Sequence, residues 1–319
     1  MTGSIVLPSF LTARSAYDTV TVCRRVMRSE GDLHVDASRL RFVDPFGIAM
    51  LGAAFSCKRD AGSEISLSGI TTDAGSYLER MDVFRDVRIE SRDSVSERHN
   101  RQDSLVELTS LTEVGDVPAT AMRLSHAIVG VFPGVDKKAP PDEMTGYTDF
   151  ERLVEPLQYV LSELLENALT HARRAGYAHA GVWVAAQYFP SRERVQLSVV
   201  DNGCGFLGSL RNHPELKNDS HLSAILLAFR PRISCNRERG VMGCSVNQGV
   251  GLTTALRIIE RANGKMVAVS GNSVHDSAGF SETWARDEVW QGVAIGIEMQ
   301  RNRLREVRSS RSSLHPRQF

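Results

Sequence analysis

The stretch from Leu161 to Arg173, LSELLENALTHAR, constrains the fold more than any other part of the chain. At about 100° per residue its apolar side chains fall on one continuous arc of a helix, and that arc extends back to Leu157. The opposite arc is polar, with His171 on its edge. There Glu163 and Asn167 lie at i and i+4, so a carboxylate and a carboxamide point the same way. The pattern predicts an amphipathic helix that presents both groups, although a purely solvated face would show it too.

The charge and composition of the chain limit the functions it can have. Lys and Arg equal Asp and Glu at 38 each, so the formal net charge is zero and a nucleic-acid partner is disfavoured. No segment approaches about 18 uninterrupted apolar residues, so we expect no membrane span and a cytoplasmic location. Five scattered cysteines, with no C-x-x-C pair, indicate reduced thiols rather than a zinc site.

Residues 1–90 alternate short strand and helix patterns and predict a small α/β domain. One strand in this region ends at Asp44, and a helix with an apolar face follows as far as Lys58. Pro45 is well placed in the first turn of that helix, because its missing N–H would have no partner there.

The rest of the chain divides by composition. Residues 91–103 are nearly devoid of apolar side chains and are expected to be a linker. Residues 304–319 are rich in arginine and serine and are expected to be a disordered basic tail. Between them, residues 104–303 are long enough to bury a core of their own and are predicted to form a second domain.

Two predicted strands follow the central helix and pair antiparallel, over 180–188 and 195–200. The second ends in Asp201-Asn202-Gly203-Cys204-Gly205. A carboxylate at a strand end can accept a hydrogen bond from an exocyclic amine, and the glycines let a flat ring approach the backbone. Taken alone, D-x-G-x-G is explained equally well by a simple turn.

A glycine-rich segment, Gly240 to Leu252, opens a further predicted helix that runs from Thr253 to Ala262. Such a segment offers free backbone N–H groups and the positive end of the helix dipole to phosphate. It is not a Walker loop, because no Gly-Lys-Ser/Thr follows. It is not a dinucleotide fingerprint either, because no strand precedes it.

The three motifs, E-x-x-x-N, D-x-G-x-G and G-x-G-L, occur in this order and resemble those of the Bergerat-type GHKL superfamily. That superfamily includes gyrase, histidine kinases and the anti-sigma-factor serine kinases. The resemblance covers about residues 103–303. It implies an α+β fold, a Bergerat-type α/β sandwich with a mixed sheet and helices on one face, and it implies ATP and Mg²⁺ as cofactors.

The resemblance also assigns roles to single residues. Glu163 would be the catalytic residue that orients or deprotonates the attacking water or hydroxyl. Asn167 would be the metal ligand, holding Mg²⁺ at the phosphates, and Asp201 would read the adenine amino group. Five backbone positions would shape the adenine pocket or cradle phosphate beneath a lid spanning roughly 212–248: Gly203, Gly205, Gly249, Gly251 and Leu252.

The turn Asp44-Pro45-Phe46-Gly47-Ile48 resembles the STAS family, the anti-sigma-factor-antagonist fold, whose turn reads D-S-S-G-L. Pro45 stands where that family's phosphorylated hydroxyl would be, so the implied domain is a docking or dimerising module. An unrelated small α/β domain remains the alternative.

One departure from the ATPase motifs concerns the last strand. Gly292-Val293 stands where Gly-Thr is usual, so a hydroxyl that often supports the adenine-binding carboxylate is missing.

These features favour an ATP-binding regulatory protein of the anti-sigma serine-kinase branch, which hydrolyses ATP or phosphorylates a Ser/Thr on a partner protein. Ordinary histidine-kinase function is disfavoured, because no histidine lies in a phosphoacceptor pattern. The alternative is a non-catalytic ATP-sensing switch that binds a partner protein. A DNA-transacting ATPase of the gyrase kind is a third, weaker reading, since the chain is neutral. A homodimer is left open.

Overall fold

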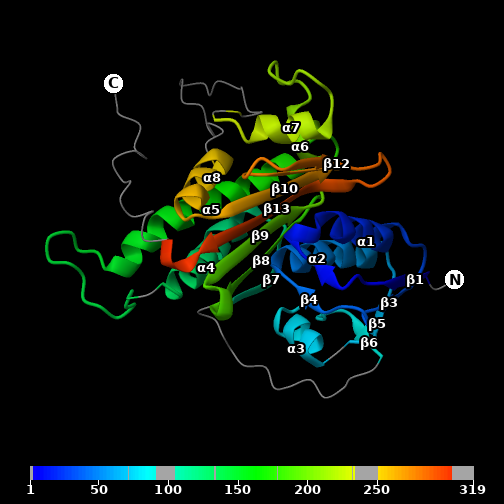
Figure 1. Cartoon of the computed structure of the whole chain (residues 1–319), viewed down its shortest axis with the longest axis horizontal. Coiled ribbons are helices and arrows are strands. Elements are labelled where there is room, and N and C mark those ends of the chain that lie inside the picture. The colour runs from blue at the N-terminus through cyan, green and yellow to red at the C-terminus, as the bar shows by residue number, and fades with distance from the viewer. Residues whose placement is uncertain are drawn as a thin grey trace.

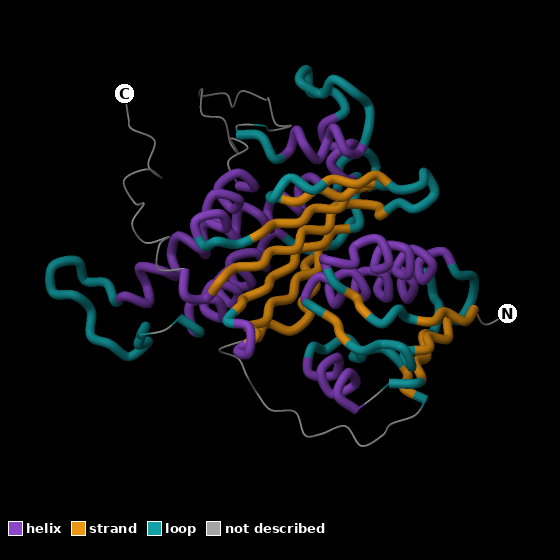
Figure 2. The backbone as a smooth tube through the Cα atoms, in the orientation of Figure 1, coloured by secondary structure: helices purple, strands orange, loops and turns teal. Residues whose placement is uncertain are grey.

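The computed structural model describes residues 3–70, 72–90, 105–132, 134–177, 179–231, 233 and 251–303. Figures 1 and 2 show two groups of elements, a smaller one built from the N-terminal residues and a larger one around a long twisted sheet. The predicted linker and tail, and Gly249, lie outside the described residues.

The N-terminal unit, residues 3–90, contains a four-stranded parallel sheet in the order β1-β3-β5-β6. Its elements are β1 (Gly3–Val6), β2 (Phe10–Leu11), α1 (Ala16–Arg28), β3 (Leu33–Asp36), β4 (Phe42–Val43), α2 (Pro45–Asp60), β5 (Ile65–Ser68), α3 (Thr72–Arg80) and β6 (Arg88–Ile89). Helix α2 begins as predicted: Pro45 is its first residue, and the Asp44 carboxylate accepts a hydrogen bond from the Gly47 N–H at 3.0 Å. This contact satisfies one of the free N–H groups of the first turn.

The larger sheet has seven strands in the order β12-β11-β10-β13-β9-β8-β7. They are β7 (Leu105–Leu111), β8 (Val182–Phe189), β9 (Arg194–Asp201), β10 (Lys265–Gly271), β11 (Ser273–Asp276), β12 (Ser281–Thr283) and β13 (Trp290–Gln300). Every pairing in it is antiparallel, so the expected mixed sheet is wrong for the described strands. The reason is topological. The last strand, β13, inserts between β9 and β10 and separates two strands that would otherwise pair parallel.

One face of this sheet is covered by helices of the same half of the chain, as predicted (Figure 1). Helices α4 (Val117–Gly130), α5 (Asp149–Ala172) and α8 (Gly251–Arg261) share a single buried apolar cluster with the strands. The short helices α6 (Gly205–Leu210) and α7 (His221–Ala228) lie at one end of it. No helix in the described ranges is both long and apolar enough to cross a bilayer.

The opposite face of the sheet is covered in part by α1 and α2 of the N-terminal unit (Figure 2). The prediction of helices on one face holds for the helices of residues 104–303, whereas the covering of the other face by the N-terminal unit was not predicted. From Pro45 to Phe55 every residue of α2 is buried. A helix that is apolar all round must be enclosed, and α2 has sheet strands on both sides. The contact with the large sheet is tight, because a Cβ added at Gly296 would lie 3.1 Å from the Phe46 ring.

Candidate functional site

Helix α5 has the two faces that its sequence predicts. The apolar arc is buried, including Leu157, Leu161 and Leu165. A capping box starts the helix: the Thr148 hydroxyl accepts from the Glu151 N–H at 3.1 Å, and the Glu151 carboxylate accepts from the Thr148 N–H at 2.8 Å. The buried arc and the cap fix the rotation of α5, and that rotation decides where its polar groups point.

Asp201 ends β9, and its carboxylate is the most constrained polar group of the site. It is buried, and its Oδ1 accepts from the Gly203 N–H at 2.9 Å and from the Val293 N–H at 3.2 Å. Its backbone carbonyl accepts from the indole Nε1 of Trp290 at 3.0 Å. The other carboxylate oxygen, Oδ2, has no hydrogen-bond partner among the described residues. Burial raises the pKa of Asp201 to about 7, against the opposing effect of the two N–H groups.

Two glycines allow the backbone to pack around this carboxylate. A Cβ at Gly203 would lie 2.2 Å from the Ala172 carbonyl oxygen, at the end of α5. A Cβ at Gly292, where φ is +108°, would lie 2.1 Å from the Asp201 carbonyl oxygen. Neither position leaves room for a side chain, so these two glycines bring α5, β9 and β13 together at one point.

Without a hydroxyl at Val293, Asp201 is supported by backbone N–H groups, and a hydroxyl from another strand holds the backbone beside it. The Val293 backbone N–H itself supports Asp201. The buried hydroxyl of Ser270, on β10, accepts from the Phe206 N–H at 3.0 Å and donates to the Gly292 carbonyl at 2.9 Å. Sequence reasoning missed both Ser270 and Trp290. The signal available for Ser270 was a hydroxyl directly after an apolar run, Met266 to Val269.

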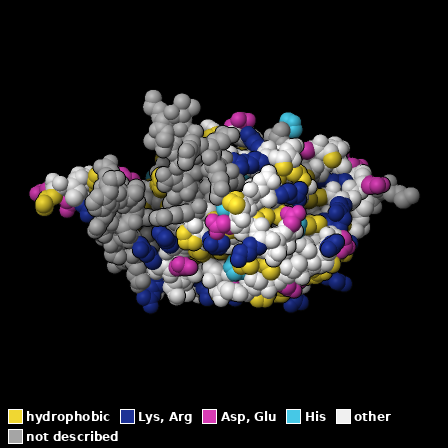
Figure 3. All heavy atoms as spheres, turned by 90° about the horizontal axis from the view of Figure 1, so that it is seen from above, with side chains coloured by type: hydrophobic (Ala, Val, Ile, Leu, Met, Phe, Trp, Pro, Cys, Tyr) yellow, Lys and Arg dark blue, Asp and Glu magenta, His cyan; other side chains and the backbone are white. Residues whose placement is uncertain are grey.

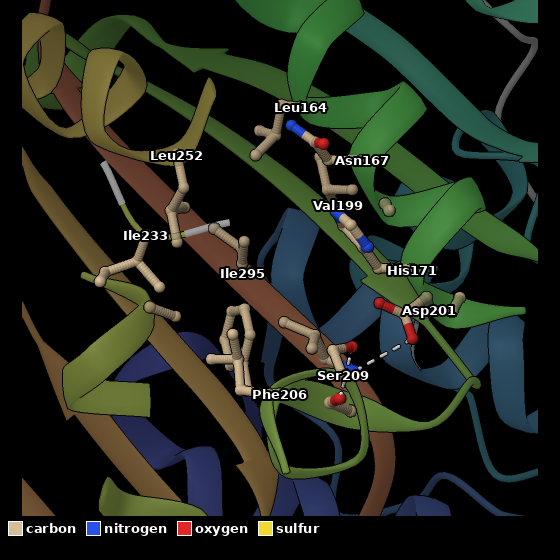
Figure 4. Close-up of a pocket in the computed structure, with 16 residues that line it drawn as sticks. Leu164, Asn167, His171, Val199, Asp201, Phe206, Ser209, Ile233, Leu252 and Ile295 are labelled. Carbon is tan, nitrogen blue, oxygen red and sulfur yellow. Dashed lines mark hydrogen bonds between the residues drawn. The ribbon is translucent and has the colours of Figure 1, made fainter. Parts of the chain in front are cut away.

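A cavity opens between α5, β9, α6 and the start of α8, and Figure 4 shows the side chains that line it. Asn167 and His171 project from α5 along one wall, and Asp201 lies at one end (Figure 4). The remaining lining is largely apolar and includes Leu164, Val199, Phe206, Ile233, Leu252 and Ile295. Burial, and then the nearby Arg174, lowers the pKa of His171 to about 4, so the imidazole is neutral at pH 7.

The other predicted site residues fall in different places. Gly205 lines the cavity and adopts φ +69°, which a side chain would strain. Gly251 is the first residue of α8, and Leu252 follows it in the cavity wall. Gly203 supports the cavity without lining it. Residues 212–231 of the predicted lid contain α7, and the stretch 234–250 lies outside the described residues.

Glu163 does not line the cavity. It lies one helical turn before Asn167 on the polar side of α5 and is half-buried. Burial, followed by the neighbouring Glu166 carboxylate, raises the pKa of Glu163 above its usual value. A carboxyl group whose pKa is shifted toward neutrality is suited to accept a proton.

A family model described as histidine kinase-, DNA gyrase B- and HSP90-like ATPase matches residues 153–281. Residues 153–281 are an ATPase domain of this family. The matched range runs from within α5 to β12 and includes Asn167 and Asp201. No curated protein and no solved structure matches the chain.

This ATPase domain implies an ATP-binding function of the ATPase or kinase-like regulatory kind. The cavity fits the base of such a ligand: the open Oδ2 of Asp201 can accept from an amino group, and apolar walls can enclose a flat ring. Among the described residues no group of three or more His, Cys, Asp or Glu could hold a metal ion. Asn167 lines the cavity, and its amide oxygen is of the kind that Mg²⁺ accepts as a ligand.

Proposed function

We propose that this chain is an ATP-binding regulatory protein whose nucleotide site is the cavity between α5, β9, α6 and α8. The observation that carries the proposal is Asp201. One of its oxygens is held by two backbone N–H groups, and the other faces an apolar cavity. A desolvated acceptor at a fixed position favours a ligand with a donor at the matching place and penalises one that lacks it. The adenine amino group is such a donor.

The phosphate end of the ligand would lie toward Asn167 and the first turn of α8. The first N–H groups of a helix have no partner within it, and together with the helix dipole they favour an anion. Leu252 already contributes to the cavity wall at this helix start. Asn167 lies one turn from Glu163 on α5, so a carboxamide and a carboxylate would face the same end of the ligand.

We further propose that Glu163 acts as the general base. It would accept the proton of a water molecule, giving ATP hydrolysis, or of a Ser/Thr hydroxyl on a partner protein, giving phosphoryl transfer. The pKa of Glu163 is raised, which suits this exchange near neutral pH. The STAS-like turn at Asp44 supports a place in the anti-sigma serine-kinase branch. The reason is that this chain would then carry an ATPase domain next to a domain that resembles an anti-sigma-factor antagonist.

The second candidate function is a non-catalytic ATP sensor, in which the nucleotide controls the binding of a partner protein. Its support is that Glu163 lies outside the cavity lining while Asp201 lies within it. Two variants separate the candidates. A sensor should keep its partner response after Glu163→Ala and lose it after Asp201→Asn. A catalytic protein should lose its output after both changes.

A DNA-transacting function receives no support from the visible surface. In Figure 3 the Lys and Arg side chains are interspersed with Asp and Glu over the described part of that face, without a continuous basic stripe. Together with the zero formal net charge, the described part of this face offers no feature that favours a nucleic-acid partner.

Calorimetric titration with ATP and ADP, each with and without Mg²⁺, tests the proposal before any phosphoryl acceptor is known. We expect saturable binding of both nucleotides, a gain in ATP affinity when Mg²⁺ is present, and loss of binding in Asp201→Asn. Absence of heat and of any thermal shift with either nucleotide would show that the cavity is not an ATP site. Turnover of the bound ATP would then be measured with the wild type and Glu163→Gln.

A further inference from the structure

Asn202 is the middle residue of the Asp201–Gly203 motif, and its side chain is not part of the cavity lining. Its Oδ1 accepts from the Gly181 N–H at 2.9 Å, just before β8. Its Nδ2 donates to the Cys57 sulfur at 3.1 Å, and its backbone carbonyl accepts from the Gln291 amide at 3.2 Å. The residue beside the adenine-binding carboxylate is therefore held from three directions.

The contact with Cys57 crosses between the two halves of the chain. Cys57 belongs to α2, in the N-terminal unit, and lies 145 positions before Asn202 in the sequence. Burial raises the pKa of the Cys57 thiol, so it is neutral at pH 7 and the contact is an N–H···S hydrogen bond. No other hydrogen bond between described residues joins α2 to the loop of this motif.

Helix α2 is itself held firmly. It is buried against the large sheet along most of its length, and a Cβ added at Gly52 would lie 2.4 Å from the Leu108 side chain of β7. The helix cannot shift by a few tenths of an ångström without disturbing that packing. A rigid helix that accepts a hydrogen bond from a binding motif can fix the position of the motif.

We propose that Asn202 is a positioning residue through which the N-terminal unit, by way of Cys57 on α2, sets the geometry of Asp201 and hence the affinity for nucleotide. The inference rests on the proposed ATP site. Nucleotide binding at Asp201 and formation of the Asn202–Cys57 hydrogen bond favour the same conformation of the Asp201–Gly203 segment. The two are thermodynamically linked, so each strengthens the other by the same factor.

The linkage can be measured on the wild-type chain through the rate at which the Cys57 thiol reacts. Cys57 is labelled with N-ethylmaleimide at pH 8, with and without saturating ATP, and its labelling rate is followed by mass spectrometry of its peptide. We expect ATP to slow the labelling of Cys57 by about 3- to 10-fold, the range of one neutral hydrogen bond. Cys23 is the internal control, because it is buried on α1 and has no contact with the motif. Equal slowing of both thiols would indicate global stabilisation and overturn the inference.

Substitutions test the same link from the other side. The dissociation constant for ATP should rise about 3- to 10-fold in Asn202→Ala and in Cys57→Ala, whereas Cys57→Ser keeps an acceptor and should stay near wild type. Cys23→Ala is the matched control and should leave the constant unchanged. Thermal unfolding of each variant checks that it is folded.

The outcomes separate this inference from the proposed function. If wild type binds ATP but both alanine variants bind it equally well, the inference is wrong and the ATP site stands. A loss confined to Asn202→Ala would leave α2 out of the coupling and would also overturn it. If wild type binds no nucleotide, the proposed function fails and takes this inference with it.

Discussion

The buried carboxylate of Asp201 makes a prediction that is independent of any ligand. In the folded protein its pKa is about 7, and in the unfolded chain it is near 3.8. Between these two pH values the Asp201 carboxyl is therefore protonated in the folded state and ionised in the unfolded chain. Stability from this group is fully present below about pH 4 and is lost as the pH rises to about 7.

The size of the effect follows from the two pKa values. At about 1.36 kcal/mol for each pKa unit, full ionisation of Asp201 costs about 4 kcal/mol of folding free energy. Close to 2 kcal/mol of this cost is already present at pH 5, and nearly all of it is present at pH 8. Asp201→Asn removes the ionisation but keeps an oxygen that can accept from the same two N–H groups.

We therefore expect Asp201→Asn to be more stable than wild type at pH 8, while ATP affinity falls at least tenfold. The stability advantage should be about 2 to 3 kcal/mol larger at pH 8 than at pH 5. Urea unfolding followed by tryptophan fluorescence at both pH values measures it. Asp44, whose pKa burial raises to about 6, is present in both proteins, so its contribution cancels in the comparison.

The same advantage at both pH values would refute this reasoning. It would mean that Asp201 ionises in the folded protein much as it does in the unfolded chain, which requires a hydrated carboxylate. The acceptor would then lack the desolvation on which selective recognition of an amino group depends. A gain in stability at the expense of binding, by contrast, is the usual exchange at a functional site.

Three further predictions concern the chemistry and the packing of the site. Glu163→Gln should lower ATP turnover by about 100-fold and change ATP affinity by less than about threefold, because a general base does not contact the adenine. Parallel turnover and calorimetric measurements decide this. Glu166→Gln is the matched control and should keep turnover. It should also move the acid limb of the pH–rate profile to lower pH, because the Glu166 charge raises the pKa of Glu163. An acid limb that does not move would contradict this effect of Glu166 on Glu163. Gly203→Ala should lower the unfolding free energy by about 2 kcal/mol or more, because its Cβ would lie 2.2 Å from a carbonyl oxygen, whereas Gly115→Ala points into open space and should change it by less than about 0.5 kcal/mol. Equal urea midpoints for these two variants would disprove the steric argument. Ser270→Ala should lower the unfolding free energy by about 1 to 3 kcal/mol and weaken ATP binding. The reason is that the Phe206 N–H and the Gly292 carbonyl lose their hydroxyl partner. Unchanged thermal unfolding and unchanged ATP affinity would exclude this role of the Ser270 hydroxyl.

Features that depend on neighbouring residues could be predicted from the sequence. The apolar arc of α5 was evident from a periodicity of 3.6 residues, and the same periodicity put Glu163 and Asn167 on its other side. The start of α2 at Pro45, and the antiparallel pairing of β8 with β9, followed from turn and cap signals. The roles of Glu163, Asn167 and Asp201 remain predictions that the variants above test.

Features that depend on topology could not be predicted in this way. The antiparallel character of the large sheet is decided by β13. This strand follows both β9 and β10 in the sequence but lies between them in the sheet. The hydroxyl of Ser270 on β10 joins the Phe206 N–H to the Gly292 carbonyl because β10 and β13 are adjacent in space. Nothing in the local pattern of either strand contains that information.

The sequence by itself determined the helix α5, the strand pair β8 and β9, and the side of α5 that carries polar groups, because these depend on contacts within a few residues. Only the tertiary structure decided that α2 lies on the free face of the ATPase sheet and that Cys57 contacts Asn202. Contacts between distant residues depend on how whole layers pack, and the free energy of burying two apolar faces together has no signature at any single position.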